Sequence, residues 1–590
     1  MGIQLTLDEQ ILLSDVVMGR KKPTRLIKGG TILNVYTGRL EKKDIALAGK
    51  RIAFIGNLKQ SGLYLDSSIE SLDLTGYTLV PGYIEPHAHP TQLYNPLTLA
   101  EKVLTLGTTT LINDNMTFFT MWNMEELLGL LDQLENYPVK QFWWARLDAQ
   151  TYLNNQEKEL FSTERVQKFL FHPLVIQAGE LTDWLPLLMG DETMLSQVTM
   201  TKQAGKRVEG HASGASYRTL SRLAAIGVTA DHESISVEEV WNRLELGYMT
   251  TLRHSSIRPD LPILIEGLLQ KENVPWHRLM LTTDGATPLY LKQGFQDHII
   301  RVAIHHGCDP IHAYQMVTIN PAIYYHMEEH IGGLAPGRLA NINVLNSLQD
   351  PTPVMVLVDG ELVAKQRKML QSFETNPWNH FKSVKWGSDW RIQEEEFSLP
   401  SRKKDKVPII QLVNAVITKL QEENLEEENG WVKWEENDDR LLVYLISPVG
   451  KWMTSAFLRG FARNIDGLAS SYNGSHDLLV IGRDKKAMAQ AANHVLEHGG
   501  GITWVQNSQI LYHIPLPISG FMSTKSVDEL NEQLEPFITQ LRAFGYTFSD
   551  PLYTFLFLSS THLPQIRLTR AGIMQVKEKK ILYSASKRGI

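Results

Sequence analysis

The segment YTLVPGYIEPHAH, residues 77–89, holds the pattern on which the fold and the chemistry of this chain depend. A short apolar run ends at a Pro81-Gly82 break, and His87 and His89 follow with one residue between them. Side chains two positions apart on a strand point the same way, so an extended segment presents both histidines as imidazole ligands. Imidazole suits several metals, so ligand type alone leaves the metal open. The alternative is a pair of surface histidines at a turn, and the rest of the chain decides between the two.

The composition is that of a soluble globular protein with several domains. Of 590 residues, 43% are hydrophobic and 21% are charged, which allows large cores. The net charge of −7 argues against a general nucleic-acid binder. The single cysteine, Cys308, excludes an intrachain disulfide, and the chain shows neither a signal-like start nor a membrane-length apolar run. We therefore predict a cytoplasmic protein whose partners include neither nucleic acid nor membrane.

Three domains are predicted along the chain. Short apolar stretches between glycine or charged clusters occur in residues 1–80 and return in residues 332–400, which predicts a β-rich, sandwich-like domain split in sequence. Residues 81–331 alternate strand and helix patterns and form the inserted middle. Residues 401–590 mix both patterns and are expected to form a C-terminal α+β domain.

Two further segments support this division. Asp528–Phe544 carries apolar residues at spacings of three and four, which predicts a helix in the C-terminal domain. Charged runs between about residues 364 and 407, such as Arg402–Lys406, are expected to be solvated connectors. We expect no binding role for them.

The middle region predicts a (β/α)8 TIM-like barrel of the α/β class. Strand and helix alternate eight times within about 250 residues, as such a barrel requires. An open doubly wound sheet is the alternative, but it more often shows a Gly-rich phosphate loop after its first strand, and the sequence has none there. The predicted strands are Leu79–Ile84, Thr108–Ile112, Gln141–Leu147, Leu174–Ala178, Arg207–Glu209, Thr229–Asp231, Met249–Arg253 and Arg278–Leu281.

Side chains of metal-ligand type follow five of these eight strands. A barrel places its reactive residues at the C-terminal ends of its strands, so we expect these side chains to meet. Four imidazoles and two carboxylates exceed the usual three protein ligands of one catalytic ion. They suit two divalent ions that share a bridging carboxylate. The predicted ligands are His87, His89, Glu180, His211, His232 and Asp284.

The motifs around these residues resemble the bacterial adenine deaminase family of the amidohydrolase superfamily. The resemblance runs along nearly the whole chain, and its C-terminal part separates this family from other amidohydrolases. The segments that carry it are Pro81–His89, Glu209–Ala212, Ala230–Glu233, Asp284-Gly285, Thr318–Ala322, Gly333–Gly337, Gly499–Gly501, Pro515–Ser523 and Asp550–Leu552.

The resemblance implies a role for each predicted ligand. His87 and His89 would hold one ion together with Asp284, His211 and His232 would hold the other, and Glu180 would bridge them. Asp284 would also move protons during catalysis. The implied reaction is the metal-dependent hydrolysis of adenine to hypoxanthine and ammonia. The ions would be Mn, Fe or Zn, with Mn favoured, and a homo-oligomer is compatible with the family.

The chain departs from the family pattern at three places near the expected pocket. Asn113–Thr117 lacks the His and Glu of the family's Asp-Pro-His-Glu element, Arg253–Ser256 stands for Arg-Glu-Gly-Ser, and Tyr472–Asp477 stands for His-Asp-Ser-His-Asn. His254 and His476 lie in the last two and are our candidates for substrate binding. The departures keep open a hydrolase of another amino-heterocycle or cyclic amide. A catalytically inactive binding scaffold is the alternative from another class.

Overall fold

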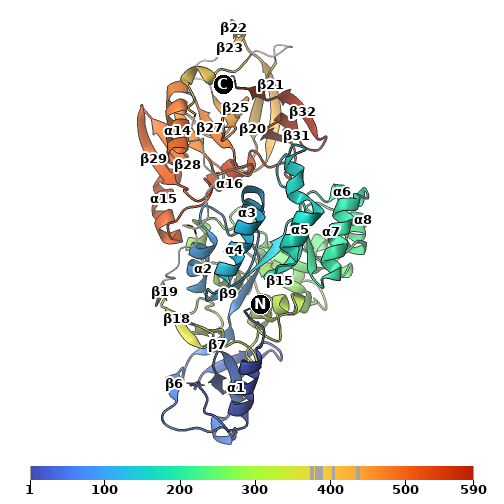
Figure 1. Cartoon of the computed structure of the whole chain (residues 1–590), viewed down its shortest axis with the longest axis vertical. Helices are drawn as coiled ribbons and strands as arrows, with labels where there is room; N and C mark the ends of the chain where they lie inside the picture. Colours follow the sequence, from blue (N-terminus) through green and yellow to red (C-terminus); the bar gives the residue numbers. More distant parts are fainter. Residues whose placement is uncertain (1, 372–377, 379–389, 401–405, 434–438, 589–590) are drawn as a thin grey trace.

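The computed structural model describes residues 2–371, 378, 390–400, 406–433 and 439–588 (Figure 1). The molecule is elongated, with the N-terminal strands at one end, a barrel in the middle and the C-terminal part at the other end. Of the predicted connector Arg402–Lys406, all but Lys406 lies outside the described residues.

The middle of the chain forms an eight-stranded parallel barrel, as predicted. Its strands pair in sequence order from β8 to β15, and a parallel bridge between Ala88 and Asp284 joins the two ends of the sheet. The (β/α)8 fold class is therefore confirmed. The strands are β8 (Tyr83–Ala88), β9 (Thr108–Asn113), β10 (Lys140–Ala145), β11 (Val175–Leu181), β12 (Arg207–Gly210), β13 (Ala230–Asp231), β14 (Met249–Arg253) and β15 (Leu279–Thr282).

Helices follow the strands and cover the barrel from outside. In α8, Ser216 caps the first turn by accepting a hydrogen bond from the Thr219 amide, and Leu220 and Leu223 face inward. None of the described helices combines the length and apolar character needed to cross a membrane. The helices of this region are α2 (Pro96–Leu104), α3 (Met116–Met121), α4 (Met124–Leu134), α5 (Thr163–Leu170), α6 (Leu185–Leu188), α7 (Glu192–Gln203), α8 (Tyr217–Ala225), α9 (Val237–Glu245), α10 (Leu261–Leu268), α11 (Gln296–His305), α12 (Pro310–Gln315) and α13 (Ile319–Tyr324).

The first predicted barrel strand, Leu79–Ile84, is wrong because the Pro81-Gly82 step separates two strands. Strand β7 (Thr78–Pro81) belongs to the β-rich sheet, whereas β8 starts the barrel. A side chain at Gly82 has no room, since its Cβ would lie 2.2 Å from Thr109 Oγ1. The chain therefore passes from sheet to barrel at a residue whose backbone approaches a neighbouring barrel strand closely.

Two sheets built from both ends of the chain form the split β-rich module. Strand β16 (Ile342–Leu345) pairs antiparallel with β7, which pairs in turn with β2. One hydrophobic cluster joins side chains of both sheets, as in a sandwich. An unpredicted helix, α1 (Leu7–Val17), packs on β5. The other strands are β1 (Arg25–Lys28), β2 (Thr31–Asn34), β3 (Arg39–Lys42), β4 (Asp44–Ala48), β5 (Arg51–Gly56), β6 (Glu70–Asp73), β17 (Met355–Val358), β18 (Glu361–Lys365) and β19 (Lys368–Met369).

The described residues between 406 and 588, which we call the C-terminal module, combine a large mixed sheet with three helices. Helix α15 (Val527–Ala543) confirms the helix predicted over Asp528–Phe544. It begins one residue earlier than predicted, because Ser526 and Glu529 form a capping box at its start. The other elements are α14 (Lys485–Glu497), α16 (Pro551–Phe557), β20 (Lys406–Leu412), β21 (Thr418–Asn424), β22 (Glu427–Glu428), β23 (Trp431–Val432), β24 (Arg440–Ile446), β25 (Trp452–Arg459), β26 (Gly467–Ser470), β27 (Leu478–Gly482), β28 (Gly501–Gln506), β29 (Gln509–Pro515), β30 (Ile566–Thr569), β31 (Gly572–Gln575), β32 (Lys580–Ser584) and β33 (Ser586–Lys587).

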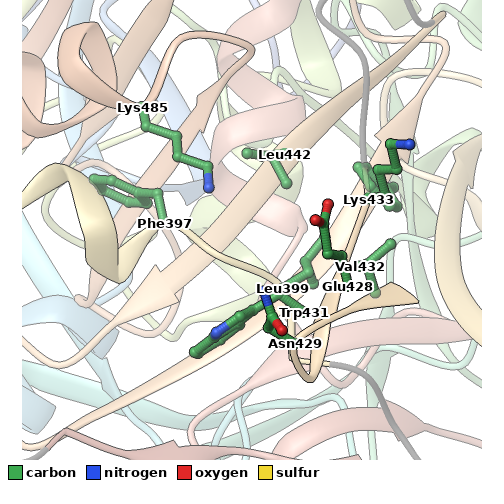
Figure 2. A pocket seen from close by; sticks show the side chains of 10 residues that line it. Phe397, Leu399, Glu428, Asn429, Trp431, Val432, Lys433, Leu442 and Lys485 are labelled. Carbon is green, nitrogen blue, oxygen red and sulfur yellow. The ribbon is translucent and has the colours of Figure 1, made fainter. Parts of the chain in front are cut away.

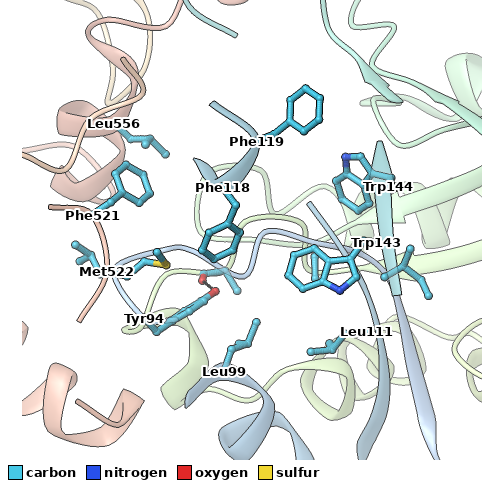
Figure 3. Packing of buried hydrophobic residues seen from close by; sticks show 14 of the residues in the cluster. Tyr94, Leu99, Leu111, Phe118, Phe119, Trp143, Trp144, Phe521, Met522 and Leu556 are labelled. Carbon is cyan, nitrogen blue, oxygen red and sulfur yellow. Dashed lines mark hydrogen bonds between the residues drawn. The ribbon is translucent and has the colours of Figure 1, made fainter. Parts of the chain in front are cut away.

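The C-terminal module packs directly against the barrel. Figure 3 shows Phe521, Met522 and Leu556 of the module facing Phe118 and Tyr94 of the barrel region, all within one hydrophobic cluster. Burying aromatic and aliphatic surface of this extent stabilises the contact. The boundaries assigned to the three domains from the sequence stay predictions, but barrel and module share one core.

Candidate active site

All six predicted ligands lie together at the C-terminal ends of the barrel strands. We call them the ligand cluster: His87, His89, Glu180, His211, His232 and Asp284. Strand β8 positions the first two, and β11, β12, β13 and β15 position one each. Side chains separated by nearly two hundred residues are thereby brought into contact, as expected for a barrel.

One half of the cluster consists of His87, His89 and Asp284. The two Nε2 atoms lie 3.2 Å apart, and His89 Nε2 lies 2.9 Å from Asp284 Oδ1. Each of the three residues offers a ligand atom, and these atoms lie within 4.8 Å of one another. The two histidines therefore project to one side, and the interpretation of a surface turn is wrong.

Glu180 connects this half to the other. Its Oε1 lies 2.5 Å from His211 Nδ1 and 3.4 Å from His232 Nε2, and its Oε2 lies 3.9 Å from His89 Nε2. One carboxylate thus faces imidazoles of both halves. This is the position that a bridging ligand would take.

The backbone of β11 explains how Glu180 reaches this position. The sequence predicts a strand that ends at Ala178, but β11 continues to Leu181 and contains Glu180. The register with β12 shifts between Ala178 and Leu181. At Gly179, a Cβ would lie 2.3 Å from the Glu209 carbonyl oxygen, so only glycine fits beside β12.

Carboxylates outside the cluster orient its imidazoles. Glu209 Oε1 lies 3.1 Å from His87 Nδ1 and 3.2 Å from His232 Nδ1, and Asp114 Oδ2 lies 3.1 Å from His89 Nδ1. An ionised carboxylate can only accept, so each Nδ1 carries a proton and Nε2 is the nitrogen left to bind a metal. The Nε2 atoms of these three rings face the carboxylate of Glu180. This donor set fits divalent cations.

Negative charge dominates around the cluster. Five carboxylates face three guanidinium groups in this region, and against the lowering effect of burial this excess of carboxylates raises the pKa of the imidazoles of His89, His211 and His232. Such an excess in a buried site favours bound cations. The groups are Asp114, Glu180, Glu209, Glu233 and Asp284 against Arg146, Arg253 and Arg258.

Two of these arginines hold the carboxylates in their ionised form. Burial alone raises the pKa of Glu180, but Arg146 at 2.9 Å and His211 bring it well below its ordinary range. Burial acts in the same way on Asp284, and Arg253 at 2.5 Å lowers its pKa. Both carboxylates are therefore charged at neutral pH and available as ligands or bases.

The sequence reasoning missed several residues that contact the cluster. Arg146 directly follows β10 and Arg253 ends β14, but arginine is not a metal-ligand type, so the ligand pattern at the strand ends does not indicate either residue. Glu233 lies 3.5 Å from His232 Nε2 and 3.6 Å from His211 Nδ1, so it is a further potential ligand. Its place beside His232 in the sequence was the available signal. Burial lowers the pKa of His562, and the positive charge of His211 lowers it further. The centres of the two rings lie 5.9 Å apart, and no feature of the sequence indicates this contact.

A pocket of about 550 Å³ opens beside the cluster, between barrel and C-terminal module. His89 and Asp114 line it from the barrel, and His476 and Phe521 line it from the module. The predicted substrate residue His476 therefore reaches this pocket. His254 does not line it: its ring lies 5.7 Å from His298, so the role predicted for His254 has no contact here to support it.

A second pocket of about 300 Å³ lies within the C-terminal module (Figure 2). Phe397 and Leu399 line it with the hairpin residues Trp431 and Lys433, and Lys485 reaches it from α14. Among the described residues its lining contains no histidine, so it lacks the imidazole donors of the ligand cluster.

The barrel and its strand-end cluster define a class of protein, the amidohydrolases. The amidohydrolase family matches residues 78–363, and the adenine deaminase C-terminal domain matches residues 415–580. Proteins named "Putative adenine deaminase" from Halalkalibacterium halodurans and Bacillus subtilis are 38% and 37% identical to this chain, each over 97% of both chains. An "Adenine deaminase" of Cenarchaeum symbiosum is 28% identical over 96% of this chain and 93% of its own.

The chain belongs to the adenine deaminase family of the amidohydrolases. It is therefore a hydrolase of C–N bonds, from a family of metal-dependent enzymes. The full-length match includes the C-terminal module, which bears out the resemblance found in the motifs.

Proposed function

We propose that this protein hydrolyses adenine to hypoxanthine and ammonia with the help of divalent metal ions. The observation that carries the proposal is the ligand cluster: six donors converge beside a pocket of suitable size. The names of its full-length relatives support adenine as the substrate. The role would be in purine metabolism.

The donors fit two ions. His87, His89 and Asp284 would hold one, His211 and His232 the other, and Glu180 both. Imidazole and carboxylate ligands suit Mn, Fe and Zn, and the family resemblance favours Mn. When bound, such ions lower the pKa of a coordinated water toward neutrality, which supplies a nucleophile at neutral pH.

Asp284 is the proposed proton carrier. Arg253 donates to Asp284 Oδ2 at 2.5 Å and keeps the carboxylate ionised, so it can accept a proton from the attacking water. The water oxygen forms a bond to C6 of adenine, and the bond from C6 to the amino nitrogen breaks. The two hydrogens of the water end on N1 of the ring and on the ammonia that leaves.

The pocket suits a flat heteroaromatic base. His476 places a ring 4.9 Å from that of Phe521, and its Nδ1 is buried without a partner in the described part of the chain. Burial lowers the pKa of His476 to about 4, so its imidazole is neutral at pH 7. A neutral imidazole can donate to or accept from a ring nitrogen of the substrate.

One observation favours a second candidate, a hydrolase of another amino-heterocycle or cyclic amide. Asn115 lies in the segment that departs from the family's Asp-Pro-His-Glu element, and it is buried with both amide atoms lacking a hydrogen-bond partner among the described residues. Its neighbour Asp114 lines the pocket. An unpaired amide next to the pocket wall is able to change which heterocycle fits.

The test is turnover by the metal-loaded protein. Protein reconstituted with Mn²⁺ is incubated with adenine, and the amounts of hypoxanthine and ammonia formed are measured. The two amounts are expected to be equal. Aminopurines, pterins and cyclic amides are assayed in parallel. Absence of turnover of adenine with Mn²⁺, Fe²⁺ and Zn²⁺ would refute the proposal, and a clear preference for another compound would favour the second candidate.

A further inference from the structure

Three histidines form a separate cluster in the C-terminal module. His494 and His498 lie four residues apart at the end of α14, and His513 lies on β29. Each offers one nitrogen as a potential ligand, and the three atoms lie within 4.8 Å of one another. Residues four apart share a helix face, so the helix places its two imidazoles side by side. In Figure 1, α14 and β29 lie on the same side of the module.

Hydrogen bonds engage the Nδ1 atom of every ring in this cluster. Thr503 Oγ1 lies 3.2 Å from His494 Nδ1 and 3.0 Å from His513 Nδ1, and His498 Nδ1 lies 2.8 Å from the His494 carbonyl oxygen. The hydroxyl of Thr503 has two lone pairs and can accept from both rings. In that arrangement, all three Nε2 atoms keep their lone pairs for a ligand, as the orienting partners of metal-bound histidines require.

The Nε2 atom of His513 supplies an independent sign that a ligand belongs here. It is buried and has no hydrogen-bond partner within the described residues. Burying a polar atom unsatisfied costs about 1–3 kcal/mol, and a metal bond would remove that cost. Gly501 makes room for this ring, because a Cβ there would lie 2.9 Å from His513 Cε1.

We propose that His494, His498 and His513 bind a single divalent transition-metal ion of the Zn²⁺ class. Three imidazoles give a site with a position left for solvent, which is open because His498 is exposed. The carbonyl end of α14 adds a favourable field for a cation. The ion joins the last turn of α14 to β29 and stabilises this part of the module. The site is independent of the ligand cluster in the barrel.

The test is zinc content after equilibrium dialysis of the full-length protein against Zn²⁺, measured by mass spectrometry. The wild type is expected to hold one Zn²⁺ per chain more than the His498→Gln variant or the His513→Gln variant. His498 is exposed, so its replacement leaves the fold intact. The matched control replaces His305 and His306, two consecutive histidines at the end of α11 in the barrel region, by glutamine and is expected to keep the full zinc content.

Thr503→Val is a second variant that removes no ligand. Loss of the hydroxyl that orients two rings is expected to weaken binding of the extra Zn²⁺ by about 10–100-fold. Bound Zn²⁺ is also expected to raise the unfolding temperature of the wild type more than that of His498→Gln. Equal zinc content in the wild type, His498→Gln and His513→Gln would overturn the proposal, whatever the activity of the barrel site.

Discussion

Replacing Glu180 by glutamine tests the ligand that both halves of the cluster share. The substitution keeps the shape of the side chain and removes its charge. Because the carboxylate faces His211 at 2.5 Å on one side and His89 at 3.9 Å on the other, we expect metal affinity to fall at both positions. The loss should exceed the roughly 10–100-fold that removal of an orienting residue costs, and turnover should be abolished.

The same substitution has a predictable effect on stability without metal. Arg146 is fully buried and contacts two carboxylates, Glu180 at 2.9 Å and Asp114 at 2.7 Å. Stripping a buried ion of its only partner costs roughly 3–5 kcal/mol. Here Asp114 stays and the glutamine carbonyl can still accept, so we expect a loss of about 1–2 kcal/mol in the free energy of unfolding.

Metal content after dialysis, turnover and urea unfolding of the metal-free protein measure these effects. Asp148→Asn is the matched control, because Asp148 is a buried carboxylate nearby that bonds Thr182 at 3.2 Å instead of the cluster. We expect the control to keep its metal. A Glu180→Gln protein with native metal content and native turnover would refute the reasoning.

Three further predictions concern single side chains. Asp284→Asn should lower kcat by about 10²–10⁴-fold with little change in folding, which steady-state kinetics and circular dichroism measure. An unchanged kcat would contradict the role of Asp284 as the proton carrier. Glu209→Gln should weaken metal binding by about 10–100-fold, because Glu209 orients His87 and His232, and metal titration checks this. The pKa of His476 falls to about 4 on folding, so the unfolded chain takes up the proton first as pH falls below about 6.5. The free energy of unfolding therefore falls as pH drops from about 6.5 to 4, and His476→Asn should remove up to about 3 kcal/mol of this fall. Unfolding curves at several pH values measure the effect, and an unchanged pH dependence in the variant would contradict the prediction.

The barrel was predictable because its pattern is local. Each strand and helix is visible in a short window of sequence, and parallel strands bring their C-terminal ends to one place. The ligand types at those ends were visible for the same reason. The first strand was misplaced because Val80 and Ile84 are both apolar, and only tertiary contacts show that they belong to different sheets.

The rest of the site depends on contacts that no local pattern contains. Glu209 orients His87 across 122 positions of sequence, and Arg146 pairs with Asp114 across 32. The inward position of Glu180 results from a register shift in β11, which the apolar run does not reveal. His476 reaches the pocket only because the C-terminal module packs on the barrel.

Anomalous diffraction from crystals of the Mn²⁺-loaded protein tests the central claim most directly. The account predicts two peaks that flank Glu180, one beside His87, His89 and Asp284 and the other beside His211 and His232. The carboxylate of Glu180 should contact both. A map without a peak in the cluster, or with peaks that Glu180 does not contact, would contradict the account.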